Sequence, residues 1–92
     1  MKTVWCQLWE ESEKGWGVRP DGYSLHSNQE DVKKYIKEYW DGMPKQTPDE
    51  YSRPVGDAYQ IQASDEVFEQ VAASENGVRH FSPKWGPGEK VL

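Results

Sequence analysis

The chain has 92 residues and a formal net charge of -5, and much of its apolar material is aromatic, with five tryptophans and five tyrosines. A chain of this length forms one domain with one modest core, and its negative charge argues against a nucleic-acid backbone as the general partner, since such binding depends on Lys and Arg. No apolar run approaches the ~20 residues that cross a membrane, and the single cysteine, Cys6, excludes an internal disulfide framework. We therefore expect a soluble, cytoplasmic protein.

The first quarter of the chain has the pattern of β-structure. Side chains alternate in residues 3–9, which is the period of a strand, and residues 16–19 predict a second strand after a polar turn. The sequence Arg19-Pro20-Asp21-Gly22 then predicts a hairpin turn into a third strand over residues 23–26, because proline presets the first turn position and glycine accepts the left-handed conformation. We therefore expect three strands before the first helix.

A helix is predicted next. The sequence Ser27-Asn28-Gln29-Glu30 has the spacing of a capping box, which satisfies free backbone N–H groups at a helix start. Apolar side chains recur at helical spacing from Val32 to Met43, opposite a charged side. We expect Gly42 to end this helix in a left-handed cap, and we expect the proline-containing segment 43–56 to be a long loop.

The remaining third of the chain alternates strand and helix signals. Residues 58–63 alternate as a strand with one solvated face. Ser64 is placed to cap a short helix that ends near Asn76-Gly77, and its acidic first turn suits the positive end of the helix dipole. Residues 78–81 predict a last short strand, and residues 83–92 form a tail rich in proline and glycine.

These elements predict a single α+β domain over residues 1–82. Their order is β-β-β-α-β-α-β, in a mainly antiparallel sheet of four or five strands with two helices packed on one face. The tail, residues 83–92, is expected to dock through Trp85. The other sheet face would then carry an aromatic patch, which must be covered by the tail, the long loop, another subunit or a ligand. This patch would be formed by Trp5 and Trp9 together with Trp16 or Tyr23.

The aromatic and acidic residues indicate a binding protein. Trp and Tyr beside charged residues are typical of interface hot spots, and an acidic chain suits a partner with a basic surface. The leading hypothesis is a non-enzymatic module that occludes a host protein. In overall character the chain resembles small proteins encoded by phages and mobile elements, which antagonise host systems stoichiometrically. The residues expected to bind the partner are Trp5, Trp9, Trp16, Trp85, Glu10, Glu11 and Glu13.

An alternative of a different class is a binder, or sponge, for an anionic, ring-containing small molecule such as a nucleotide-like signal, helped by assembly into a homodimer or higher oligomer. Guanidinium groups pair with phosphates in a fork and stack on rings, and all three arginines lie outside the predicted helices. The simpler interpretation, in which each arginine is a separate surface ion-pair partner, stays open. The residues of the alternative pocket are Arg19, Tyr23, His26, Tyr51, Arg53 and Arg79.

A catalytic interpretation centres on His26 as a base, with Ser24 or Cys6 as the nucleophile. A base needs hydrogen-bond reach to its nucleophile, and residues two apart on one strand face are near but seldom aligned. His26 and His80 are far apart in the sequence, and no spacing of His, Cys or carboxylates repeats a metal-ligand pattern. We therefore expect no catalytic residue, no metal site and no cofactor.

Overall fold

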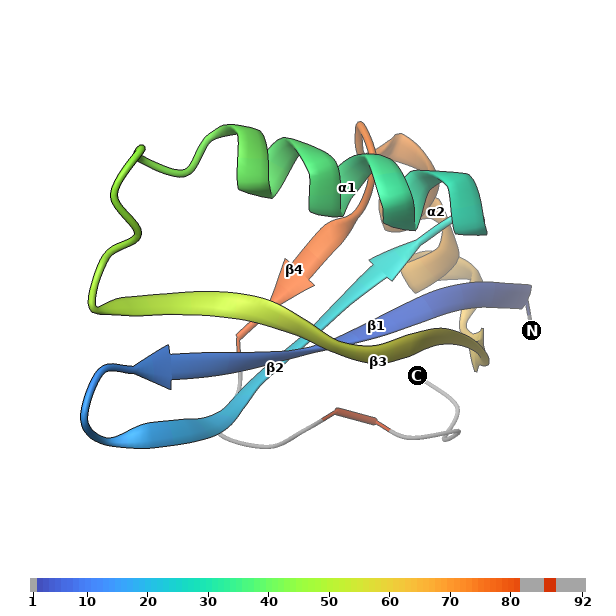
Figure 1. Ribbon diagram of the computed structural model, residues 1–92. Coiled ribbons are helices and arrows are strands. Elements are labelled where there is room, and N and C mark those ends of the chain that lie inside the picture. Colours follow the sequence, from blue (N-terminus) through green and yellow to red (C-terminus); the bar gives the residue numbers. More distant parts are fainter. Residues whose placement is uncertain (1, 82–85, 88–92) are drawn as a thin grey trace.

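The computed structural model describes residues 2–81 and 86–87 of the chain. The four strands form one antiparallel sheet in the order β3-β1-β2-β4, with both helices packed on it (Figure 1). The α+β class and the antiparallel sheet expected from the sequence are therefore confirmed. Neither helix in the described ranges is long and apolar enough to cross a lipid bilayer. In chain order the elements are β1 (Lys2–Glu13), β2 (Gly17–His26), α1 (Gln29–Asp41), β3 (Glu50–Ala63), α2 (Asp65–Ala73) and β4 (Val78–His80).

The turn expected at residues 20–22 is instead part of a continuous strand, β2. The pairing of β2 with β1 slips between Leu8 and Glu10, so that one residue of β1, Trp9, lies opposite two residues of β2. Gly22 has a φ of 82°, in the left-handed region that favours glycine. The residue types that form a tight turn therefore form a β-bulge here, because a bulge needs the same backbone freedom.

The turn that joins β1 to β2 lies before residues 20–22, at residues 14–16. Glu13 and Gly17 are the last paired residues, which leaves the three-residue loop 14–16. The backbone N–H of Trp16 donates to the carbonyl oxygen of Glu13 at 3.0 Å. Gly15 has a φ of 83°, as a three-residue hairpin loop with a left-handed position requires. The second and third strands expected from the sequence are thus a single strand.

The two helices pack on opposite faces of the sheet, which corrects the expectation that they share one face. Successive side chains of a strand point to opposite faces. On β1, Cys6 belongs to the core that includes Val71 of α2, whereas Trp9 contacts Tyr35 of α1. Figure 1 shows α1 above the sheet and α2 on its far side. The sheet is therefore the middle layer of the fold.

The α2 face of the sheet carries the main hydrophobic core. Beyond α2 on this face, Gly86 lies so close to Leu8 that a Cβ atom at Gly86 would be 2.6 Å from Leu8 Cδ2. Figure 1 shows residues 86–87 on the side of the sheet away from α1. Trp85, which was expected to dock the tail, lies outside the described residues. The buried core residues are Val4, Cys6, Leu25, Ile61, Ala63 and Val71.

The helix ends follow from local hydrogen bonds. The N-cap of α1 is Asn28, whose side chain accepts a hydrogen bond from the backbone N–H of Asp31 at 2.8 Å. Gly42 ends α1 with a φ of -81°, in the right-handed region and not in the expected left-handed cap. Ser64 caps α2 as expected, by accepting from the backbone N–H of Val67 at 3.2 Å.

Half of the segment expected as a long loop, residues 50–56, belongs to β3. This strand begins at Glu50 and pairs with β1 along nearly its whole length, with an interruption at residues 56–58. The side-chain amide of Gln7 fills this irregularity: it donates to the carbonyl oxygens of Val55 and Gly56, each at 3.1 Å. The buried Gln7 amide therefore replaces the strand hydrogen bonds that the bulge removes.

Candidate functional site

Trp9 is a core residue and not part of an exposed patch. Its side chain is 0% exposed, and its ring lies edge-on to the rings of Tyr35 and Tyr39 in α1, with centroid distances of 5.9 and 5.2 Å. Trp5 is half-buried on the same face of β1. The aromatic sheet surface expected from the sequence is therefore covered by α1 at Trp9.

A chain of hydrogen bonds links Trp9 to the connection that precedes β4. The indole N–H of Trp9 donates to Ser24 Oγ at 2.8 Å, and Ser24 Oγ lies 2.7 Å from His26 Nε2. His26 Nδ1 lies 2.6 Å from the carbonyl oxygen of Asn76. A carbonyl only accepts, so Nδ1 carries the hydrogen and Nε2 accepts from the Ser24 hydroxyl. In the described part of the chain, every buried side-chain nitrogen and oxygen atom has a hydrogen-bond partner.

The residues of the catalytic interpretation are buried. Ser24 and His26 are within hydrogen-bond reach, but both side chains are 0% exposed. Burial lowers the pKa of His26, which favours the neutral ring. Cys6 lies on the other face of the sheet, where burial raises the pKa of its thiol to about 11. The geometry therefore assigns all three residues to the packing of the fold.

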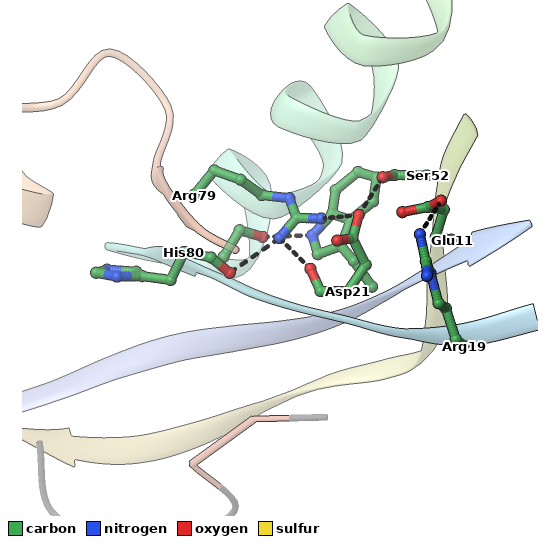
Figure 2. Close-up of polar contacts among 8 residues, drawn as sticks. Glu11, Arg19, Asp21, Ser52, Arg79 and His80 are labelled. Atoms are coloured by element: carbon green, nitrogen blue, oxygen red, sulfur yellow. Dashed lines mark hydrogen bonds and ion pairs between the residues drawn. The ribbon is translucent and has the colours of Figure 1, made fainter. Parts of the chain in front are cut away.

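Arg79 forms a buried clamp between strands (Figure 2). Its side chain is 11% exposed, and its guanidinium donates to the Asp21 carbonyl oxygen at 2.7 Å and to the Asp21 carboxylate at 3.1 Å. The Ser52 hydroxyl donates to the same carboxylate. The guanidinium also lies over the rings of Trp9 and Phe81, at 5.0 and 4.3 Å. Burial lowers the pKa of Arg79, and the Asp21 charge opposes this shift.

Arg19 sits among carboxylates at the end of the β1–β2 hairpin. Its guanidinium contacts Glu11 at 2.7 Å and Glu13 at 3.0 Å, and Figure 2 shows the Glu11 pair separate from the Arg79 clamp. Carboxylate oxygens of Glu11, Glu13 and Glu50 lie within 4.8 Å of one another. The bond to Arg19 lowers the pKa of Glu11, whereas the neighbouring Glu11 raises the pKa of Glu13. We call these three glutamates the carboxylate cluster.

The third arginine, Arg53, pairs with a different carboxylate from the other two. Arg53 Nε donates to Glu10 at 2.8 Å. Because Glu10 and Glu11 are neighbours in β1, their side chains point to opposite faces, and so do their partners, Arg53 and Arg19. Tyr23 stacks on His80 with a ring-centroid distance of 5.0 Å, on the α2 face. Among the residues proposed for the small-molecule pocket, Arg53 interacts with Tyr51, but the three arginines contact different carboxylates.

Two tryptophans are accessible at one end of the molecule. Trp16, in the loop between β1 and β2, is 84% exposed, and Trp40, near the end of α1, is 40% exposed. Figure 1 shows that the β1–β2 loop, the end of α1, the loop that follows it and the start of β3 all lie at this end. We call residues 14–18 and 40–51 the loop end.

Local contacts hold the loop end together. The backbone N–H of Lys14 donates to the carbonyl oxygen of Asp49 at 2.9 Å, which joins the hairpin to the loop after α1. The Trp40 ring lies edge-on to Tyr51, with a centroid distance of 6.1 Å. The carboxylate cluster borders this end, because its members lie at the last pairs of β1 and β3. Aromatic and acidic side chains are therefore combined here.

An open groove of about 630 Å³ lies between α1 and the bulge of β3. Trp5 and Gln7 contribute to its lining from β1, and Lys33 and Asp57 from its two walls. Sequence reasoning missed this groove, because a bulge in β3 produces it and the alternation of residues 58–63 gives no sign of an irregularity just before them.

Comparisons of this chain with protein-family models, with curated proteins and with solved structures find no match.

Proposed function

We propose that this protein is a non-enzymatic binding module that acts in the cytoplasm and occludes a partner protein by docking through its loop end. The exposure of Trp16 carries this proposal. The fold buries Trp9 completely but leaves Trp16 84% exposed at a hairpin tip. An exposed tryptophan contributes little to folding, whereas tryptophan is among the residues that contribute most when an interface forms.

The charges beside Trp16 support a partner with a basic surface. One guanidinium, that of Arg19, lies among the three carboxylates of the cluster, which leaves an excess of negative charge. A hydrogen bond with Glu11 raises the pKa of Glu13, and the nearby charges of Glu50 and Glu11 raise it further. A lysine or arginine of a partner would relieve the repulsion, and the chain's net charge of -5 would speed the encounter with a basic surface.

The molecule is large enough for such an interface. It exposes 6038 Å² in total, and a standard interface buries about 800 Å² on each partner. The fold is elongated, with extents of 42 × 24 × 19 Å, so its end presents a compact docking surface. Once docked, the module would block access of other molecules to the contacted surface of its partner, which is inhibition by occlusion.

The test is capture of partners from the lysate of the protein's own host by tagged variants. Trp16→Ala and Glu50→Gln change the loop end, whereas Phe81→Ala and Glu69→Gln are matched changes of exposed residues elsewhere. We expect a basic protein to be retained by the wild type and both controls, and to be lost with Trp16→Ala and weakened with Glu50→Gln. Equal retention by all variants, or retention of no protein, would contradict the proposal.

A further inference from the structure

The groove between α1 and the bulge of β3 has the size and the composition of a small-molecule site. Its volume of about 630 Å³ falls within the roughly 300–1,000 Å³ that is typical of ligand pockets. Apolar side chains line it from two elements, Trp5 from β1 and Val32 and Ile36 from α1. Such a lining, with a few placed polar groups, is the usual composition of a small-molecule site. The described lining residues all lie outside the loop end.

A buried amide supplies a fixed polar group to this groove. Gln7, which contributes to the lining, is 3% exposed, and its amide nitrogen donates to three backbone carbonyl oxygens at 3.0–3.1 Å. A primary amide nitrogen carries only two hydrogens, so the donors of Gln7 are fully used. What Gln7 can offer a ligand is therefore its carbonyl oxygen, which accepts a hydrogen bond from a donor such as an ammonium group.

The two walls of the groove carry opposite charges. Lys33 lies on the α1 wall, and its Nζ is 3.8 Å from a carboxylate oxygen of Glu30, with the two side chains 70% and 75% exposed. An exposed pair at this distance is weak, so the Lys33 ammonium is available to an incoming carboxylate. Asp57 lies on the β3 wall and follows Gly56, whose carbonyl oxygen accepts from Gln7. The groove is therefore negative and hydrogen-bond-accepting on the β3 side and positive on the α1 side.

We propose that this groove binds a small zwitterion with an apolar side chain, which is either an apolar amino acid or a short peptide of such residues. The ammonium group of the ligand lies at Asp57 and Gln7, and its carboxylate lies at Lys33. The apolar side chain packs against Trp5. A ligand with a single charge would leave one wall of the groove unpaired, whereas a zwitterion complements both walls and, having no net charge, is not repelled by the chain's charge of -5.

The experiment removes one charge at a time, from the protein and from the ligand. Lys33→Gln and Asp57→Asn each remove the charge of one wall, and the controls Lys34→Gln and Asp65→Asn make the same changes at exposed positions outside the groove. The probes are L-leucine and L-leucyl-L-leucine, with L-leucine amide and N-acetyl-L-leucine as ligands that lack the carboxylate or the ammonium charge. Circular dichroism and thermal melts check that every variant folds, and NMR titration of the nitrogen-15-labelled protein measures each dissociation constant.

We expect at least one of the two zwitterions to shift the indole N–H resonance of Trp5 and the amide resonances of residues 56–58, with a dissociation constant of about 1 mM or lower. The tighter of the two identifies the source of the ligand. Lys33→Gln and Asp57→Asn should each raise this constant about threefold or more, and the controls should leave it unchanged. L-leucine amide should bind Lys33→Gln as it binds the wild type, and N-acetyl-L-leucine should bind Asp57→Asn as it binds the wild type.

Three outcomes would overturn the proposal. The first is a groove whose resonances do not move with either zwitterion up to about 20 mM, well above the expected dissociation constant. The second is binding that Lys33→Gln and Asp57→Asn weaken no more than the controls do. The third is binding of the singly charged ligands by the wild type as tight as that of L-leucine. None of these outcomes bears on docking through the loop end, because the two sites share no described residue.

Discussion

Ser24→Ala tests the buried hydrogen-bond chain that joins β1, β2 and the connection before β4. The Ser24 hydroxyl accepts from the indole N–H of Trp9 and donates to Nε2 of His26, in a region with no exposure. Alanine removes both bonds and leaves a buried donor and a buried acceptor without partners. Each such group costs about 1–3 kcal/mol, so the free energy of unfolding should fall by roughly 2–6 kcal/mol.

Urea unfolding followed by tryptophan fluorescence at neutral pH measures this loss, and thermal melts provide a second reading. For a domain of this size, 1 kcal/mol corresponds to about 4–8 °C in the melting temperature. The matched control is Ser52→Ala, whose hydroxyl donates to the Asp21 carboxylate. This carboxylate keeps Arg79 as a partner and is 16% exposed, so we expect a loss of about 1.5 kcal/mol. If Ser24→Ala is as stable as Ser52→Ala, the buried chain does not have the energetic role assigned to it.

Two further predictions concern His26 and its surroundings. Burial lowers the pKa of His26, so the unfolded chain takes up the proton first as the pH falls below the ordinary value of 6.5. Stability that is present above that pH should therefore be lost progressively below it, with a limiting slope of about 1.4 kcal/mol per pH unit. The urea midpoint, measured at a series of pH values below 6.5, should no longer depend on pH in His26→Gln but should still do so in His80→Gln. An unchanged pH dependence in His26→Gln would refute the assignment of this effect to His26. Gly77→Ala should lower the free energy of unfolding by about 1–3 kcal/mol, because a Cβ atom there would lie 2.3 Å from His26 Nδ1. In the control, Gly42→Ala, the nearest atom to the new Cβ would lie at 3.4 Å, so the free energy of unfolding should change by less than about 0.5 kcal/mol. Equal denaturation midpoints for these two glycine variants would contradict the close packing at His26.

Local signals in the sequence predicted the elements that depend on local interactions. The helical spacing from Val32 to Met43 predicted α1, and Ser64 predicted the start of α2, because the period of a helix and the reach of a cap involve residues within a few positions of each other. The alternation of residues 58–63 likewise predicted the second part of β3. These features are confirmed because their physical causes are contained in short segments.

Features that depend on distant partners could not be predicted in this way. Pro20 and Gly22 suit a turn and a bulge equally well, and only the pairing with β1 decides between them. Trp9 and Trp16 are both tryptophans near polar residues, but α1 covers the first and nothing described covers the second. The carboxylates that the arginines contact lie 6 or more residues away in the sequence, and the sequence alone does not pair them.

The most direct test of the proposed binding function is native mass spectrometry of the protein isolated from its own host under gentle conditions. The account predicts a complex with a protein partner at fixed stoichiometry, with each copy of this chain occupied, and predicts that the complex dissociates when Trp16 is replaced by alanine. A complex whose abundance does not change in Trp16→Ala would contradict docking through the loop end. A chain that carries only a small-molecule mass, with no protein partner, would contradict the binding function itself.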